Sequence, residues 1–417
     1  MIDVSLPGRA PNSSSGSNPS DLFQIMRDGQ PRTRSELAAM TGLARSTVAL
    51  RVDALMQLGL LRPVSSAIST GGRPSTQFCL NSTGHVVLGV DVGASHVRVA
   101  VSDLNGTVID EASVNLDIAQ GPEIVLGEVM SLGDELLAAI DDEYGALMAV
   151  GVGLPGPVEH STGRPISPPI MPGWDRYDVS GVLGAHFGVP VLVDNDVNIM
   201  ALGERELAWS DVDDLIFIKI ATGIGAGVIS GGILQRGAQG TAGDLGHVFV
   251  ARGTEIVCRC GNRGCLEALA SGPAIARALT AASATAGAPS DAEATAPKTS
   301  LDVVALVRQG DVDAIQAVRQ AGRDLGEVLT TCVSLMNPSV IVIGGALSTA
   351  GEHLIAGVRE SIYTRAMPFA TEHLQIIQSR IGANAAIAGA GVLAIQSALS
   401  IDRVDAMVLA LTDARAS

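Results

Sequence analysis

The spacing of apolar residues changes along the chain and predicts its division into segments. Residues 1–20 are rich in Ser, Gly, Pro and Asn, which predicts a disordered tail. Residues 32–61 repeat apolar side chains at helical spacing, with one interruption at 41–43 where a turn is expected. From residue 84 onward, short apolar runs alternate with longer amphipathic ones. This alternation predicts an α/β fold.

The segment 32–61 predicts a helix-turn-helix. Ser35 is expected to cap its first helix and Gly42 to make the turn. The side chains expected on the buried side are Leu37, Met40, Val48, Val52 and Leu55. The exposed N-terminal side of the second helix offers residues that could reach phosphates and base edges in a DNA major groove, namely Arg45, Ser46, Thr47, Ala49 and Arg51.

The polar stretch 62–80 predicts two short strands joined at 71–74, which would complete a winged helix-turn-helix domain over 21–82. Arg73, at the tip of this wing, is expected to enter a minor groove, because narrow A·T tracts attract arginine. Between residues 21 and 80 there are seven arginines and four acidic residues, a local charge of +3 in a chain of net charge -16. The alternative is a helical hairpin that packs against the larger domain and touches no DNA.

Two glycine-rich turns between strands predict a pair of related lobes, 84–208 and 209–382, each with a phosphate-binding hairpin. In such a hairpin, backbone N–H groups approach an anion and an aspartate such as Asp91 can hold a magnesium ion. The candidate nucleotide or phosphate residues are Asp91, Gly93, Ser95, Thr222, Gly223, Gly344 and Gly345. Ordinary β-hairpins that turn on the same residue types are the alternative.

A buried strand ends in Asp194, Asn195 and Asp196, just before a helix. Because α/β folds bind ligands at the carboxyl ends of strands, Asp196 is expected to be a general base for a sugar hydroxyl and Asn195 a positioning group. The alternative is helix capping alone, since both residue types are preferred at an N-cap. Three successive polar residues exceed what capping needs, and this favours a site.

One histidine and three of the five cysteines fall within residues 240–267. Folding this stretch around a metal is expected to bring the carboxylates of Asp244 and Glu267 close to the metal site, where they could accept hydrogen bonds from sugar hydroxyls. A few reduced thiols beside an unrelated histidine are the alternative. A closed tetrahedral zinc site that braces the loop, with no position for a reactive water, is predicted from His247, Cys258, Cys260 and Cys265.

The amino-acid composition indicates in which cellular compartment the protein is expected. Hydrophobic residues make up 47% of the 417, yet no apolar run reaches the roughly twenty residues that span a bilayer. The N-terminus lacks the apolar core of a signal peptide, and Cys79 and Cys332 stand too isolated for a disulfide framework. A cytoplasmic location without a membrane partner is expected. Residues 281–300 predict a mobile surface loop, and the tail after Asp402 supports no prediction.

Eight motifs occur in an order that resembles the ROK family, named for repressors, open reading frames and sugar kinases: DVGASH, GVGLPGPV, MPGWD, VDNDVN, ATGIGAGV, GTAGDLGH, CRCGNRGCLE and IGGA. The N-terminal segment resembles the winged helix-turn-helix of its repressor branch. The resemblance implies an actin-like, hexokinase-type, two-lobed ATPase fold with a sugar in the cleft. The first lobe would be joined by the C-terminal helix at 383–400.

The resemblance also implies roles for single residues. The position of Asp196 is the catalytic base of the kinase members. The implied sugar-binding positions are Asn195, Asp196, Asp244, His247 and Glu267. The implied zinc ligands are again His247, Cys258, Cys260 and Cys265, in the motif 247–265.

Four positions depart from the kinase pattern. The kinase motif DIGGTK is replaced at 91–96, where Ala94 and His96 count against ATP binding. Ile170 stands where the family has Asn, and Asp244 where it has Glu, which alters the sugar hydroxyls within reach. Retention of Asp196 keeps phosphoryl transfer chemically possible.

The leading hypothesis is a sugar-responsive repressor that acts as a homodimer or homotetramer on a palindromic double-stranded operator, with structural zinc. One alternative is a sugar kinase that uses magnesium-ATP and Asp196 as its base. Another is a regulator whose cleft binds a phosphosugar, or no sugar at all, and which responds to a partner protein.

Overall fold

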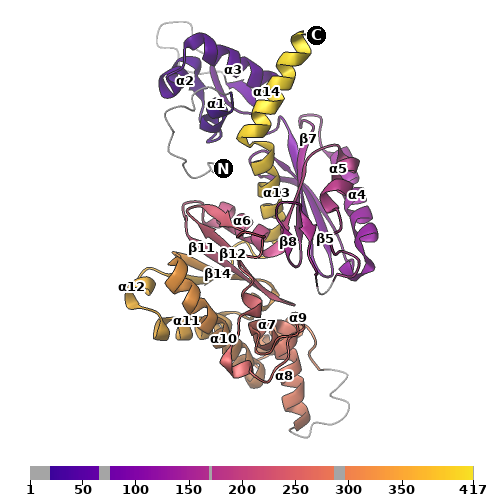
Figure 1. Ribbon diagram of the computed structural model, residues 1–417, viewed down its shortest axis with the longest axis vertical. Helices are drawn as coiled ribbons and strands as arrows, with labels where there is room; N and C mark the ends of the chain where they lie inside the picture. Colours follow the sequence, from indigo (N-terminus) through magenta and orange to yellow (C-terminus); the bar gives the residue numbers. More distant parts are fainter. Residues whose placement is uncertain (1–18, 65–75, 169–170, 286–295, 417) are drawn as a thin grey trace.

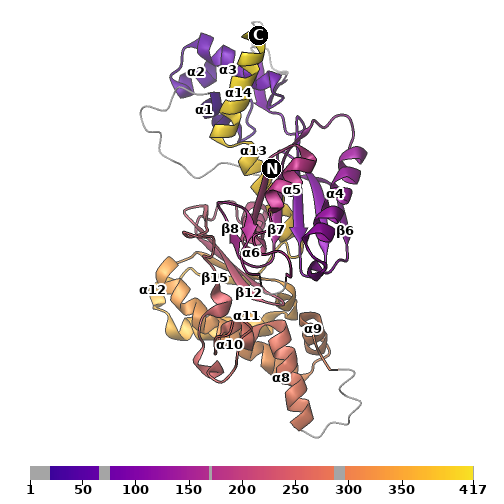
Figure 2. The same ribbon diagram turned by 45° about the vertical axis from the view of Figure 1, so that its right-hand side comes forward.

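The computed structural model describes residues 19–64, 76–168, 171–285 and 296–416. Several sequence expectations lie outside this part of the chain: the tail before residue 19, Arg73, Ile170 and the middle of the segment 281–300. An N-terminal unit and two α/β lobes follow one another along the long axis, and the C-terminal helix returns to the N-terminal unit (Figure 1). The same order is visible after a turn of 45° (Figure 2).

The N-terminal unit contains three helices and a small antiparallel sheet of order β1-β3-β2. Its elements are α1 (Pro19–Met26), β1 (Arg32–Thr33), α2 (Arg34–Thr41), α3 (Arg45–Gln57), β2 (Leu61–Val64) and β3 (Gln77–Leu80). The expected turn is present, since Gly42 ends α2 with a left-handed φ of 71°. Strands β2 and β3 pair in the manner of a wing.

Two expectations for helix α2 were wrong. Thr33, and not Ser35, caps α2: its hydroxyl accepts from the backbone N–H of Glu36, whose carboxylate accepts from the N–H of Thr33 in return. Thr33 takes this place because it ends β1 in an extended conformation. Met40 is 55% exposed, since the eight-residue helix buries only the side on which Leu37 lies. The expected core positions Val48, Val52 and Leu55 are fully buried.

The first lobe is built on a five-stranded sheet of order β10-β7-β4-β5-β6. Its strands are β4 (Val86–Val92), β5 (Val97–Asp103), β6 (Val108–Val114), β7 (Leu147–Leu154) and β10 (Val191–Asn195). The first three pair antiparallel, whereas β7 and β10 run parallel to β4. Helix α4 (Pro122–Ala139) packs against β5, and α5 (Val179–Phe187) packs against β10.

The second lobe repeats this plan with a sheet of order β13-β12-β11-β14-β15. Its strands are β11 (Leu215–Ile220), β12 (Ile224–Ser230), β13 (Ile233–Gln235), β14 (Val340–Gly344) and β15 (Gln375–Gln378). Its outer core is formed with α7 (Leu266–Ala270), α8 (Gly272–Thr285), α9 (Ser300–Arg308), α10 (Val312–Met336) and α11 (Glu352–Arg365). Two similar lobes confirm the α/β, hexokinase-like expectation.

Two helices, α6 (Asp196–Ala208) and α13 (Asn384–Ala398), lie between the sheets. Helix α13 packs against β4 and β7 of the first sheet, and α6 packs against β11 and β12 of the second. The two backbones touch: a Cβ on Gly389 would lie 1.8 Å from the Ile199 carbonyl oxygen, and one on Gly203 would lie 2.1 Å from that of Ala385. The lobes are thus joined through a helix pair that only glycine permits to approach this closely.

The last helix, α14 (Ile401–Ala416), is an element for which the sequence supported no prediction. It packs against α1 and α3 of the N-terminal unit, beside which it lies in both views (Figures 1 and 2). Its buried side chains Val404 and Val408 join one core cluster with Phe23 of α1 and Ala398 of α13. The N-terminal unit and the first lobe therefore share a hydrophobic core.

Within the described ranges, no single helix has the length and apolar character to cross a membrane. The bent pair Asn384–Ala398 and Ile401–Asp413 meets that test together by length and composition.

Substitution Gly389→Ala is expected to lower the free energy of unfolding by about 1–3 kcal/mol, because the new methyl group must push α6 and α13 apart. The matched control is Gly127→Ala in α4, where a Cβ would meet nothing within 4 Å. That change should raise the free energy of unfolding by roughly 0.5–1 kcal/mol through helix propensity. Urea denaturation of both variants makes the comparison, and equal effects would contradict the close crossing.

Candidate functional site

The carboxyl ends of three parallel strands form one edge of the first sheet. In the strand register, Asp91 of β4 and Asp194 of β10 both stand opposite Gly153 of β7, so the two strands end at the same level. Gly153 contributes no side chain between them. Polar residues that are about a hundred positions apart in sequence are thereby gathered at one edge, where α/β folds bind ligands.

Asp194 has a structural role that the sequence did not reveal. Its carboxylate accepts from the backbone N–H of Asn195 at 2.8 Å, from Asn198 Nδ2 at 2.8 Å and from Arg236 Nε at 2.7 Å. The residue is only 3% exposed, so every one of these partners offsets the cost of burying its charge. Because Arg236 follows β13, the contact joins the two lobes.

Asn195 caps helix α6, as the helix-capping alternative predicted. Its Oδ1 accepts from the Val197 backbone N–H at 3.0 Å, and its Nδ2 donates to the Gly156 carbonyl. Both ends of the amide are therefore engaged by the protein itself. The side chain remains partly exposed at the start of α6, next to Asp196.

Asp196, the first residue of α6, forms an ion pair with Lys219 of β11. Burial lowers the pKa of Lys219, but the charge and hydrogen bond of Asp196, together with the charge of Asp91, outweigh it, so the pKa is raised. The ammonium is therefore charged at neutral pH. Sequence reasoning missed Lys219, although one signal was present: it is the only charged residue in the apolar strand LIFIKI.

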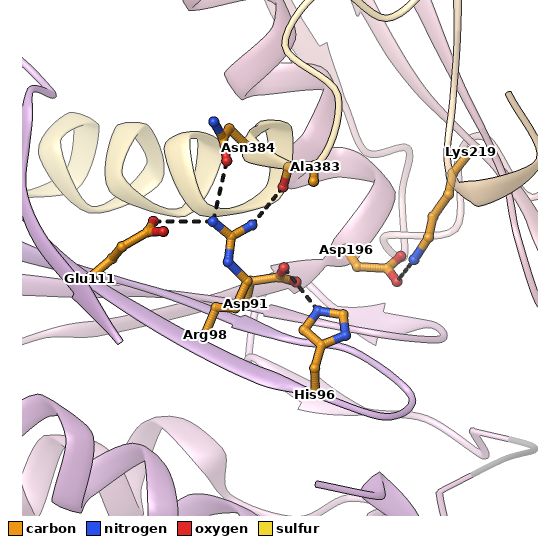
Figure 3. A network of polar contacts seen from close by, with 8 residues as sticks. All are labelled: Asp91, His96, Arg98, Glu111, Asp196, Lys219, Ala383 and Asn384. Carbon is orange, nitrogen blue, oxygen red and sulfur yellow. Dashed lines mark hydrogen bonds and ion pairs between the residues drawn. The ribbon is translucent and has the colours of Figure 1, made fainter. Parts of the chain in front are cut away.

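Asp91 is 7% exposed and is also paired within the chain. The Nε2 atom of His96 lies 3.2 Å from Asp91 Oδ2, and the imidazole ring covers Gly93 so closely that a Cβ there would lie 2.1 Å from it. Figure 3 shows this contact beside the Asp196–Lys219 pair. Nearby, Arg98 donates to Glu111, to the Ala383 carbonyl and to Asn384 at the start of α13.

The remaining candidate phosphate residues have different surroundings. Ser95 and Thr222 are exposed at the tips of their turns. At the turn after β14, the space beside the glycines is filled by the protein itself. A Cβ on Gly344 would meet the Phe217 ring, and one on Gly345 would meet the Ile220 backbone at 2.5 Å. Internal packing thus accounts for this pair of glycines without a nucleotide.

The zinc motif brings its four candidate ligands together. One donor atom from each of the four lies within 4.8 Å of the others. Cys258 Sγ is 3.7 Å from His247 Nδ1, and Cys260 Sγ is 3.6 Å from Cys265 Sγ. Zn–S bonds of about 2.3 Å in a tetrahedron place sulfur atoms about 3.8 Å apart, so these separations fit a metal ion and exclude a disulfide.

The thiols by themselves do not ionise together. Burial raises the pKa of Cys265 to about 12, whereas a hydrogen bond from the Asn262 backbone lowers that of Cys260. Three thiolates at this separation repel one another, and a bound cation is what would make them compatible. His247 faces the cluster with Nδ1, so Nε2 is the ring nitrogen that is not turned to Cys258.

The two carboxylates of this region flank the second glycine turn. Glu267, half-buried at the start of α7, accepts from the Ile224 backbone N–H at 3.2 Å. A Cβ on Gly223 would lie 2.7 Å from its Oε2 atom. Asp244 is exposed where the short helix Leu245–His247 begins, and that helix packs against β12 and α7. Strand β12 therefore has Glu267, Asp244 and His247 around it.

The second helix of the N-terminal unit presents part of the expected DNA-facing set. Arg45 and Ser46 are exposed, and Thr47 is half-buried. The expectation for Arg51 was wrong: it is 8% exposed because it lies three residues after Val48 and next to Val52, on the buried side of α3. Leu50 is 72% exposed in its place, and Arg73 lies outside the described residues.

The chain is similar in sequence to known proteins of one family. A model of the ROK family matches residues 87–397, more than half of the chain. The xylose repressor of Bacillus spizizenii is 27% identical over 383 residues, which are 91% of this chain and 95% of the repressor. The glucokinase of Thermotoga maritima is 30% identical over 314 residues, or 73% of this chain and 95% of the kinase.

A solved structure supports the same division. The crystal structure of a ROK family transcriptional regulator, described as a homologue of the Escherichia coli Mlc protein, has a TM-score of 0.79 at 26% identity. It covers 94% of this chain, and this chain covers 98% of it. Repressor relatives thus match nearly the whole length, whereas the kinase relative matches less of it. The chain belongs to the ROK family, and its full-length relatives include transcriptional repressors.

Proposed function

We propose that this protein is a cytoplasmic, sugar-responsive transcriptional repressor in which α6 transmits the state of the cleft to the DNA-binding unit. The observation that carries the proposal is the path of this one helix. It begins at Asp196, which pairs with Lys219, and ten residues later carries Glu206, whose negative charge acts on Arg27 of the N-terminal unit. A rigid helix with a charged group near each end can relay a displacement from one end to the other.

The link at the far end of α6 is electrostatic and involves two buried groups of opposite charge. Arg27, directly after α1, is 2% exposed, and Glu206 is 8% exposed. Burial lowers the pKa of Arg27 to about 10, while the negative charge of Glu206 acts in the opposite direction. The guanidinium is therefore still charged at neutral pH. Because an isolated buried charge is costly, the separation between Arg27 and Glu206 must stay nearly the same when α6 moves.

Other contacts hold the DNA-binding unit to the same helical framework. Ser20 Oγ donates to Asp405 of α14 at 2.9 Å, and Gln24 Nε2 donates to the Leu399 carbonyl at 3.0 Å. His85 Nε2 lies 2.7 Å from the carbonyl oxygen of Leu58. Together with the shared hydrophobic core, these contacts make the N-terminal unit move with the first lobe as one body.

The proposed response starts at the cleft. A sugar that hydrogen-bonds to Asn195, Asp196, His247, Asp244 and Glu267 would join groups from both lobes. Its binding favours one separation of the lobes over another and so shifts the position of α6. In a homodimer this shift changes the spacing of two recognition helices, which must stay about one DNA turn, roughly 34 Å, apart on a palindromic operator.

Helix α3 supplies the proposed DNA contact. Its first residues, Arg45 and Ser46, are exposed, and its N-cap Ala44 makes no side-chain capping bond. The unsatisfied backbone N–H groups there suit a phosphate oxygen. Arg45 is placed to read a base edge, Thr47 to support it and exposed Leu50 to meet a thymine methyl group.

The four metal-ligand candidates are proposed to hold a structural zinc ion. Zinc bound there would fix the loop that carries His247, Cys258, Cys260 and Cys265, and would keep Glu267 and Asp244 on either side of β12. The site is closed, so the metal would organise the cleft without itself contacting water or sugar.

A sugar kinase remains a second candidate, because Asp196 lies at the strand edge where the kinase members of the family have their base. Its engagement by Lys219 counts against this candidate. ADP release in the presence of magnesium-ATP and a panel of sugars, with Asp196→Ala as control, separates the two.

Arg45→Ala is expected to weaken binding to DNA selected from a randomised duplex library by more than about tenfold, or about 1–3 kcal/mol, if the side chain reads a base. Fluorescence anisotropy of the labelled duplex measures the affinity. Arg51→Ala should change it less, since Arg51 is buried away from the DNA-facing side. An unchanged affinity in Arg45→Ala would remove α3 from the DNA interface.

Glu206→Gln is expected to reduce the effect of sugar on DNA affinity about fivefold or more, because the loss of its charge uncouples α6 from Arg27. The control is Glu352→Gln, an exposed glutamate paired with Arg359 on the second lobe. The double variant Arg27→Met/Glu206→Gln removes the buried charge left by the first change and should fold normally while remaining uncoupled. A normal sugar response in this double variant would contradict the role of α6.

Cys260→Ser is expected to lose bound zinc and the greater part of the sugar affinity together, since one of four ligands is removed from the loop. Metal content by mass spectrometry and sugar binding by calorimetry give the two readings. Cys332→Ser, outside the motif, serves as control. Zinc-free protein with normal sugar affinity would separate the metal from the cleft.

A further inference from the structure

An ammonium group lies beside the carboxylates at the carboxyl edge of the first sheet. Asp91 lies near the end of β4 and Asp196 directly follows β10, with β7 between these two strands, and Lys219 reaches toward Asp196 from β11 of the second lobe (Figure 3). Lys219 forms an ion pair with Asp196, and Asp91 is close enough for its charge to help raise the pKa of the ammonium. The ammonium is thus bound by Asp196 and also feels the charge of Asp91.

We infer that Lys219 is a specificity-determining residue: its ammonium permanently fills the cation position between Asp91 and Asp196 and so excludes a divalent metal and the nucleotide that would accompany it. The inference concerns the cleft alone and does not depend on DNA binding.

The first argument is electrostatic. A divalent ion bound to Asp91 would be repelled by the charged ammonium that pairs with Asp196, and the side chains of Asp91 and Asp196 are only 9% and 11% exposed. Repulsion between like charges is strong when little water screens it. The ammonium also neutralises the Asp196 carboxylate, which would otherwise attract a metal ion.

The second argument concerns the base. For a carboxylate to accept the proton of a hydroxyl, it must be free to approach that hydroxyl, and its negative charge must not be compensated. In Asp196, Oδ2 is taken by Lys219, which leaves Oδ1 for a ligand. Such an oxygen can still accept a hydrogen bond from a sugar. Lys219 therefore leaves Asp196 able to bind a sugar but unable to act as a catalytic base.

The third argument is the position of His96. Its ring covers Gly93 and bonds to Asp91, so the first glycine turn is closed by a side chain of the same hairpin. Both acids required for phosphoryl transfer are thus bound to bases of the chain itself. A sugar without a metal-nucleotide partner is the ligand class that this cleft accepts.

The test is a titration of zinc-loaded protein with Mn²⁺, in which the electron paramagnetic resonance signal reports the free ion. Lys219→Met, which keeps the length of the side chain and removes its charge, is expected to bind Mn²⁺ at least about tenfold more tightly than the unaltered protein. Lys219→Arg keeps the charge and should bind no more Mn²⁺ than the unaltered protein. Arg319→Met, which breaks an exposed ion pair on the second lobe, should also leave binding unchanged.

Adding Asp196→Asn to Lys219→Met should abolish the gain, which locates the ion between the two lobes. Equal Mn²⁺ affinity in the unaltered protein and in Lys219→Met would overturn the inference, as would a gain that survives loss of the Asp196 charge. If Lys219→Met does not fold, as judged by circular dichroism, Lys219→Gln provides the same loss of charge with a polar side chain. None of these outcomes depends on an operator or on the identity of the sugar.

Discussion

The close crossing of α6 and α13 is the constraint on which the rest of the structure depends. Because Gly203 and Gly389 have no side chains, the two helices meet backbone to backbone, and each also packs against one of the two sheets. Their meeting joins the two lobes. It also sets the direction of α6, which carries Asp196 at one end and Glu206 at the other. A displacement at either end must be accommodated by this contact.

Two buried acids at the carboxyl edge of the first sheet are paired with bases from the other lobe. Asp194 is bound by Arg236 and Asp196 by Lys219, and both bases come from the second lobe. These pairs join the lobes as well as neutralise the acids. In this chain the acids at the strand ends are engaged by the protein itself.

Repressor relatives match this chain over nearly its whole length, and the structure indicates why the extra segments matter. The N-terminal unit has no separate core: Phe23 packs in one cluster with Ala398 and Val404 from the C-terminal helices. An N-terminal unit built in this way turns with the lobe to which it is attached. Under the proposed function, a movement of that lobe would change the spacing of two recognition helices in a dimer.

The sequence by itself determined the features that depend on local order: the strand and helix pattern of both lobes, the turn at Gly42 and the zinc-motif cysteines Cys258, Cys260 and Cys265, whose close spacing brings them together in any compact loop. Only the tertiary structure decided which distant charges meet. Lys219 and Asp196 are 23 residues apart and lie in different lobes, so no local pattern pairs them. Arg51 became buried and α14 joined the N-terminal unit for the same reason, since packing against remote elements outweighs what neighbouring residues specify.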